Sequence, residues 1–69
     1  MLKEQSLFDG FLQSLLDESA HVSIFLINGI KLQGQLNAFD DHVVILKSSI
    51  LQLVFRHAIS TVVPNKSLF

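Results

Sequence analysis

Residues 22–35 read VSIFLINGIKLQGQ, and this segment constrains the architecture more than any other. Branched and aromatic residues fill Val22–Ile27, which is typical of a β-strand. Asn28-Gly29 follows, and this dipeptide favours a type I′ hairpin turn because both central residues of such a turn need a positive φ. A two-residue turn would return the chain as a second strand and set Phe25 opposite Leu32.

Short strands are predicted along the rest of the chain. The second strand spans Ile30–Phe39, and Gly34 within it indicates a bend or a bulge. Three further strands are expected at residues 42–47, 50–55 and 58–63, with turn residues between them. The pattern predicts a strongly bent, five-stranded antiparallel sheet or small barrel.

The segment ahead of the strands predicts one amphipathic helix over about residues 7–18. Ser6-Leu7-Phe8-Asp9 is similar to a capping box at its start. Apolar residues recur at three- and four-residue spacing, namely Leu7, Phe8, Phe11, Leu12, Leu15 and Leu16. We expect this helix to cover the sheet, which gives a mainly β fold with an N-terminal helix. Residues 1–64 form a single domain, followed by a short tail at 65–69.

The composition favours self-association. A domain of 69 residues buries only about 60% of the surface that its unfolded chain exposes, and such domains usually need disulfides, a metal or partner subunits. The chain contains no cysteine, and its three histidines lack the spacing of a helical metal site. The predicted strands are apolar on both faces, so a second surface must be covered. Closure of identical subunits into a ring would also remove the strand edges.

Charge and hydropathy indicate whether the protein is soluble, secreted or membrane-bound. The net charge is −1, but the acidic residues predominate in residues 1–20, and residues 21–69 hold four basic and two acidic side chains. No apolar run approaches the roughly 18 residues that span a bilayer, and the first residues lack the apolar core of a signal peptide. We expect a soluble, cytoplasmic chain that needs no cofactor, no metal and no membrane.

Two long motifs carry a family resemblance. The first is Asn28–Gln35 with Phe39-Asp40, and the second is Phe55–Pro64, which reads FRHAISTVVP. Gln5-Ser6-Leu7 and Phe11-Leu12 agree with them, and together they resemble the Sm motifs and opening helix of the Hfq family of RNA chaperones. The resemblance spans about residues 5–64. It implies a hexameric ring that binds small regulatory RNAs and messenger RNAs and helps them to pair.

The resemblance implies an adenine-rich RNA site on one ring face, the distal face, between subunits. The matching residues are Phe25, Gly29, Ile30, Lys31, Leu32, Gln33, Gln52 and Thr61. An aromatic ring at position 25 offers a stacking surface worth about 1–3 kcal/mol per base, and glutamine amides offer a donor and an acceptor to an adenine edge. Without the resemblance, Phe25 would be assigned to the core and the glutamines to a solvated strand surface.

The opposite ring face, the proximal face, is implied to bind uridine-rich RNA around the pore. The matching positions are Asp41, His42, Arg56 and His57. Arg56 and His57 correspond to a lysine–histidine pair of the family, suited to phosphates and 2′-hydroxyls. The family usually has glutamine or lysine at 41, an aromatic at 42 and glutamine at 8. Asp41, His42 and Phe8 therefore predict altered uridine recognition.

The outer rim departs most from the family pattern. The family uses a helical arginine cluster there to promote RNA pairing, whereas this chain has Leu16, Asp17, Glu18 and Ser19. Gln13 and Phe39 are the remaining rim candidates. Because acids replace cations that would contact phosphate, we expect weak annealing activity.

Two other functional classes stay open. A structural or protein-binding ring with little RNA affinity is favoured by the negative net charge and the missing arginines. An enzyme would require His42, His57, Asp40 and Asp41 to meet in the fold, and the sequence has no serine or cysteine nucleophile motif and no phosphate-binding loop. We expect RNA as the partner, with no catalysis and no small-molecule substrate.

Overall fold

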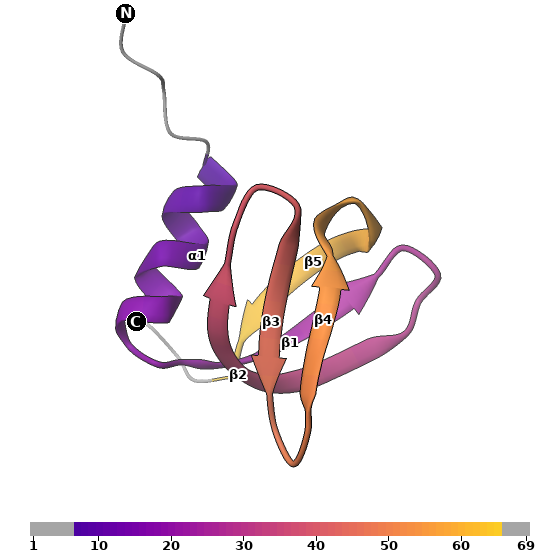
Figure 1. Cartoon of the computed structure of the whole chain (residues 1–69). Helices are drawn as coiled ribbons and strands as arrows, with labels where there is room; N and C mark the ends of the chain where they lie inside the picture. Colours follow the sequence, from indigo (N-terminus) through magenta and orange to yellow (C-terminus); the bar gives the residue numbers. More distant parts are fainter. Residues whose placement is uncertain (1–6, 66–69) are drawn as a thin grey trace, which may run out of the picture.

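One α-helix, one short 3-10 helix and five strands form the described part of the chain. The structure, a computed structural model, describes residues 7–65. The elements are α1 (Leu7–Asp17), β1 (His21–Leu26), β2 (Lys31–Phe39), β3 (Val43–Lys47), β4 (Leu51–Phe55), the 3-10 helix η1 (Arg56–Ala58) and β5 (Ile59–Pro64) (Figure 1). The bounds of α1 and of the five strands lie within one residue of their predicted positions, whereas η1 was not predicted. The predicted cap at Ser6 and tail residues 66–69 lie outside the described residues.

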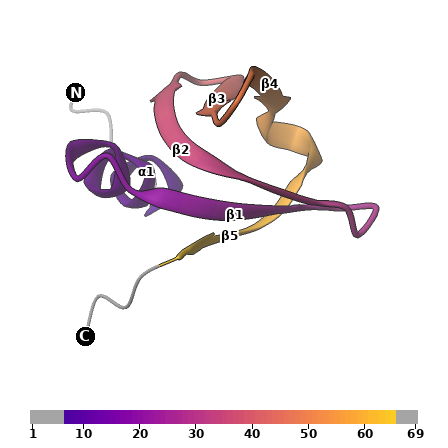
Figure 2. The same cartoon turned by 90° about the horizontal axis from the view of Figure 1, so that it is seen from below.

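The strands form one antiparallel sheet in the order β4-β3-β2-β1-β5. The sheet is strongly bent because the first half of β2 pairs with β1 and its second half with β3 (Figure 2). Gly34 lies at this bend, where an added Cβ would be only 3.0 Å from the Lys47 carbonyl oxygen. The irregularity in the register between β2 and β3 lies further along, between Leu36 and Ala38. The predicted fold class is confirmed. Glycine at position 34 lets the backbone of β2 pass close to the backbone at Lys47.

The helix covers the sheet and closes the core. The core residues are Leu12, Leu15, Ala20, Val22, Ile24, Leu36, Val44, Leu46 and Val54. Leu7 was expected to share this apolar face, but its side chain is 93% exposed. At about 100° per residue, Leu7 lies roughly a third of a turn away from the line between Leu12 and Leu15. No helix within residues 7–65 is long and apolar enough to cross a membrane.

The β1–β2 turn differs from the predicted type I′ turn. The Leu26 carbonyl accepts a hydrogen bond from the Gly29 N–H at 2.9 Å, and the Leu26 N–H donates to the Ile30 carbonyl at 2.8 Å. Gly29 has φ +92, whereas Asn28 has no positive φ. These bonds define a three-residue loop that ends with a left-handed glycine. The Asn28 Oδ1 accepts from the Ile30 N–H at 3.1 Å, which stabilises the longer loop.

The longer loop shifts the register of the hairpin. Phe25 pairs with Lys31 and Ile24 pairs with Leu32, so the predicted pairing of Phe25 with Leu32 is wrong. Leu32 instead packs against the core. A shift of one residue moves a side chain to the other face of a strand. The observed register therefore places a cation, and not an apolar side chain, beside Phe25.

The C-terminal end of α1 is a Schellman motif. The Ser19 N–H donates to the Leu16 carbonyl and the Ala20 N–H donates to the Leu15 carbonyl, each at 2.9 Å. Ser19 has φ +51, in a position that glycine usually occupies. The buried pair Leu15 and Ala20 supplies the apolar contact that accompanies this motif.

Candidate nucleic-acid interface

Three side chains form a row across β5, β1 and β2, which we call the Phe25 platform. Phe25 has Thr61 as its register partner on β5 and Lys31 as its partner on β2. Directly opposed residues share one face of a sheet. The Lys31 Nζ lies 5.8 Å from the centroid of the Phe25 ring. An aromatic surface with an adjoining cation can stack a base and attract its phosphate.

Polar residues extend the platform along the same face of the sheet. Gln33 pairs with Ser23, and its Nε2 donates to the Ser23 Oγ at 3.3 Å. The Ser23 Oγ in turn donates to the Asn65 Oδ1 at 2.8 Å. Sequence reasoning missed Ser23 and Asn65 as supports of Gln33. Ser23 could have been found from the alternation of side chains along a strand, which places it on the same face as Phe25.

The other predicted distal residues lie apart from the platform within one chain. Gly29 and the exposed Ile30 form the hairpin turn, and Leu32 is directed to the core. Gln52 lies on β4, which β3 and β2 separate from β1 in the sheet order. A single chain therefore does not place Gln52 beside Phe25.

The predicted proximal residues do come together. They line an open cavity of about 390 Å³, the His57 cavity, formed by Asp41, His42, Phe55, Arg56 and His57. The rings of Phe55 and His57 stack with centroids 5.6 Å apart and planes inclined by 25°. Sequence reasoning missed Phe55 as a support of the imidazole. Its place two residues before His57 gave no signal of this contact.

Arg56 is held by three intramolecular contacts, which form the Arg56 corner. Its Nη1 lies 2.8 Å from the Asp9 Oδ1 and donates to the Asp40 carbonyl at 2.7 Å. Its guanidinium carbon lies 4.4 Å from the centroid of the Phe8 ring. The side chain is only 16% exposed. Arg56 therefore joins the N-terminal end of α1 to the β2–β3 turn, at one end of the molecule (Figure 1).

Asp40 organises the turn beside Arg56. Its Oδ1 accepts the backbone N–H groups of His42 at 2.7 Å and Val43 at 2.9 Å. These two hydrogen bonds lower the pKa of the Asp40 carboxyl, and the charges of His42 and Arg56 lower it further. The carboxylate thus fixes the backbone that carries His42.

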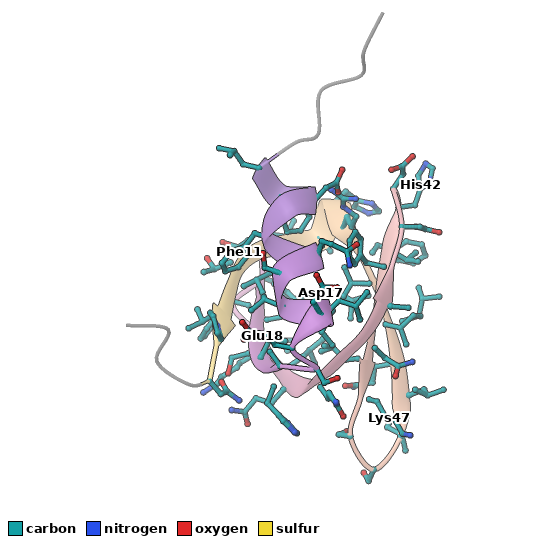
Figure 3. All side chains as sticks on the ribbon, turned by 90° about the vertical axis from the view of Figure 1, so that its left-hand side faces the viewer. Phe11, Asp17, Glu18, His42 and Lys47 are labelled. Atoms are coloured by element: carbon teal, nitrogen blue, oxygen red, sulfur yellow. The ribbon has the colours of Figure 1, made fainter. Side chains whose placement is uncertain are left out.

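The rim residues are engaged within the chain. The Gln13 Nε2 donates to the Asp17 Oδ1 at 2.8 Å, and Phe39 packs against the core. Asp17 and Glu18 lie at the C-terminal end of α1 (Figure 3). This part of the surface presents carboxylates, which do not attract phosphate.

The two edges of the sheet carry apolar surface. On β4, Leu51, Leu53 and Phe55 are exposed. Beside β5, a cavity of about 430 Å³ is lined by Phe8, Phe11 and residues 59–62. Within the described chain, β4 pairs only with β3 and β5 only with β1. Each edge strand therefore has one side open to another strand.

No group of three or more metal-ligating side chains occurs in residues 7–65.

Comparisons with known proteins agree with the sequence resemblance. The family described as "Hfq protein" matches residues 7–69. The structure is similar to a crystal structure of the pleiotropic translational regulator Hfq, with a TM-score of 0.83 and 29% identity, covering 94% of this chain and 100% of that one. An Hfq protein from Anabaena sp. gives a TM-score of 0.75 and 25% identity, covering 81% of this chain and 92% of that one.

Proposed function

The chain belongs to the Hfq family of Sm-like RNA-binding proteins, and we propose that it regulates gene expression by binding small regulatory RNAs and messenger RNAs. Adenine-rich RNA binds the distal face at the Phe25 platform, and uridine-rich RNA binds the proximal face at the His57 cavity. The observation that carries the proposal is the row of Thr61, Phe25 and Lys31, which joins a stacking surface to a cation.

We propose that six identical subunits close into a ring. The exposed apolar residues of β4, the cavity beside β5 and the open sides of both strands support this assembly. Apolar patches of this kind usually mark contact surfaces. The ring also supplies what one chain lacks, because a neighbouring subunit can bring its Gln52 towards the Phe25 platform. The number six rests on the family resemblance.

RNA annealing is proposed to be weak. Asp17 and Glu18 stand where the family pattern has arginines, and Gln13 is bonded to Asp17. The Hfq family comprises non-enzymatic RNA chaperones, and the proposed binding chemistry uses stacking, hydrogen bonds and phosphate contacts alone. A second candidate, a protein-binding ring with little RNA affinity, is favoured by the ion pair that neutralises Arg56.

Native mass spectrometry with and without a short oligo(A) tests the proposal. We expect a ring whose mass increases on addition of the oligomer, and an affinity that falls steadily as salt rises, because phosphate contacts release counterions. A ring that ignores both oligo(A) and oligo(U) would support the protein-binding candidate. A folded monomer that ignores both would refute the proposal.

A further inference from the structure

The end of the molecule that holds the His57 cavity has an excess of carboxylates. Asp9, Asp40 and Asp41 lie there with a single guanidinium, that of Arg56. The two lysines of the described chain lie elsewhere. Lys31 belongs to the Phe25 platform, and Lys47 is at the end of β3 far from His42 (Figure 3). With neutral histidines, this end repels phosphate, and a ring multiplies the repulsion.

Arg56 contributes little positive charge to the cavity. The side chains of Arg56 and Asp9 are 16% and 27% exposed in their ion pair. The same guanidinium packs over Phe8 and bonds to the Asp40 carbonyl. A phosphate could bind Arg56 only by displacing the Asp9 carboxylate. A single exposed contact between a phosphate and a guanidinium contributes little free energy in water.

His42 and His57 are the basic groups that remain accessible. Both residues are exposed, and both line the cavity. Within residues 7–65, neither imidazole takes part in a hydrogen bond or ion pair, while the His42 charge acts on the Asp40 carboxylate. Phe55 supports the His57 ring by stacking. Histidine is the side chain that gains charge between pH 8 and pH 5.

We propose that protonation of His42 and His57 switches on RNA binding at the proximal face, and that Asp9, as a positioning residue, neutralises the Arg56 guanidinium at the border of that site. This inference rests on the proposed function. Near pH 8 the carboxylates predominate and phosphate is repelled. In their protonated form, the two imidazoles of each subunit offset these carboxylates and add N–H donors for phosphate and for uracil.

Titrations of the full chain with short oligo(U) and oligo(A), at constant ionic strength, test the switch. We expect oligo(U) to bind roughly fivefold more tightly at about pH 6 than at about pH 8. Oligo(A) serves as an internal control, because the residues assigned to its site include no histidine. Its affinity should change by less than about twofold over the same range.

Histidine variants locate the response. The double variant His42→Asn and His57→Asn should lose the pH response of oligo(U) binding. His21→Asn is the matched control, because His21 is an exposed histidine at the start of β1, outside both proposed sites. That control should keep the full response.

A charge variant tests the role of Asp9. Asp9→Asn should leave the Arg56 charge without its carboxylate partner and strengthen oligo(U) binding roughly threefold at about pH 8, with a smaller gain on acidification. Glu18→Gln removes the same charge at the other end of α1 and should change neither quantity.

The outcomes separate the switch from the proposed function. Oligo(U) binding that is independent of pH, or a pH response that persists in the double histidine variant, would overturn the switch and leave the proposed function intact. Binding of oligo(A) alone would also overturn the switch. Binding of neither oligomer at either pH would overturn the proposed function together with the switch.

Discussion

The Phe25 platform and the Arg56 corner contain similar groups in different circumstances. Each joins an aromatic ring to a cation, with Lys31 near Phe25 in one and Arg56 over Phe8 in the other. Lys31 is exposed and has no ion pair within residues 7–65, whereas Arg56 is paired with Asp9. An aromatic ring with a cation thus forms the proposed binding surface in one place and a structural contact in the other.

What distinguishes the two regions is the presence of a carboxylate. An ion pair that is about three-quarters buried or more opposes the approach of phosphate, because the incoming anion must replace a carboxylate that is already fixed. Agreement of Arg56 with a family motif therefore identifies the position, but the neighbours of Arg56 decide whether its charge is available. We expect stacking to dominate affinity on the distal face and titratable charge to dominate on the proximal face.

The largest expected effect is on the platform. Phe25→Ala should weaken oligo(A) binding at least about fivefold, because a base stacked on an aromatic ring is worth about 1–3 kcal/mol. Oligo(U) affinity should stay unchanged, and Phe25→Tyr, which keeps the ring, should retain oligo(A) binding. Fluorescence anisotropy titrations measure both affinities. An unchanged oligo(A) affinity in Phe25→Ala would remove the stacking role and with it the contrast between the regions.

Arg56 should matter more for folding than for binding. Arg56→Ala is expected to lower the free energy of unfolding by about 1–2 kcal/mol, because it removes a charged hydrogen bond and a cation–π contact. At about pH 8, the oligo(U) affinity of the folded ring should fall by no more than about threefold, the reverse of the gain expected for Asp9→Asn. Chemical denaturation and titration together check this. If oligo(U) binding collapses while stability is retained, Arg56 is a phosphate ligand and the two regions act alike.

The sequence specified the elements of the fold well because strand and helix periodicity are local. It did not specify the hairpin register, because Asn28-Gly29 is compatible with both a two-residue and a three-residue loop. In the observed three-residue loop, the Asn28 Oδ1 accepts a hydrogen bond from the Ile30 N–H. In the observed register, the partner of Phe25 is therefore Lys31 and not Leu32.

The sequence indicated which residues are candidates for the proximal site, but it did not indicate their contacts. Asp41, His42, Arg56 and His57 line one cavity. The ion pair of Arg56 with Asp9 joins residues that are far apart in the chain, and no spacing rule links them. Such non-local contacts depend on how α1 seats against the sheet, which the periodicity of either element does not determine.

Acid should affect the folding of the Arg56 end in a pH range separate from the binding switch. The folded chain lowers the pKa of Asp40, mainly through the His42 and Val43 N–H groups. The ionised Asp40 therefore stabilises the fold above the ordinary carboxylate pKa, and this contribution is lost as the pH falls below about 4. Asp40→Asn should reduce the dependence of unfolding on pH in that acidic range while oligo(A) binding is retained. An identical acid profile in the variant would contradict the assignment.

The smallest expected effect lies at the end of α1 remote from Asp9. Ser19 occupies a left-handed position with φ +51, so Ser19→Gly should raise the free energy of unfolding by about 0.5–1 kcal/mol. Chemical denaturation measures the gain, and Ser14→Gly, inside the helix, is the matched control that should lose stability. Neither oligomer affinity should change in Ser19→Gly, because the helix end touches neither site. If stabilising this end of α1 altered oligo(U) binding alone, the seating of the helix and not the charge of the histidines would govern the proximal face.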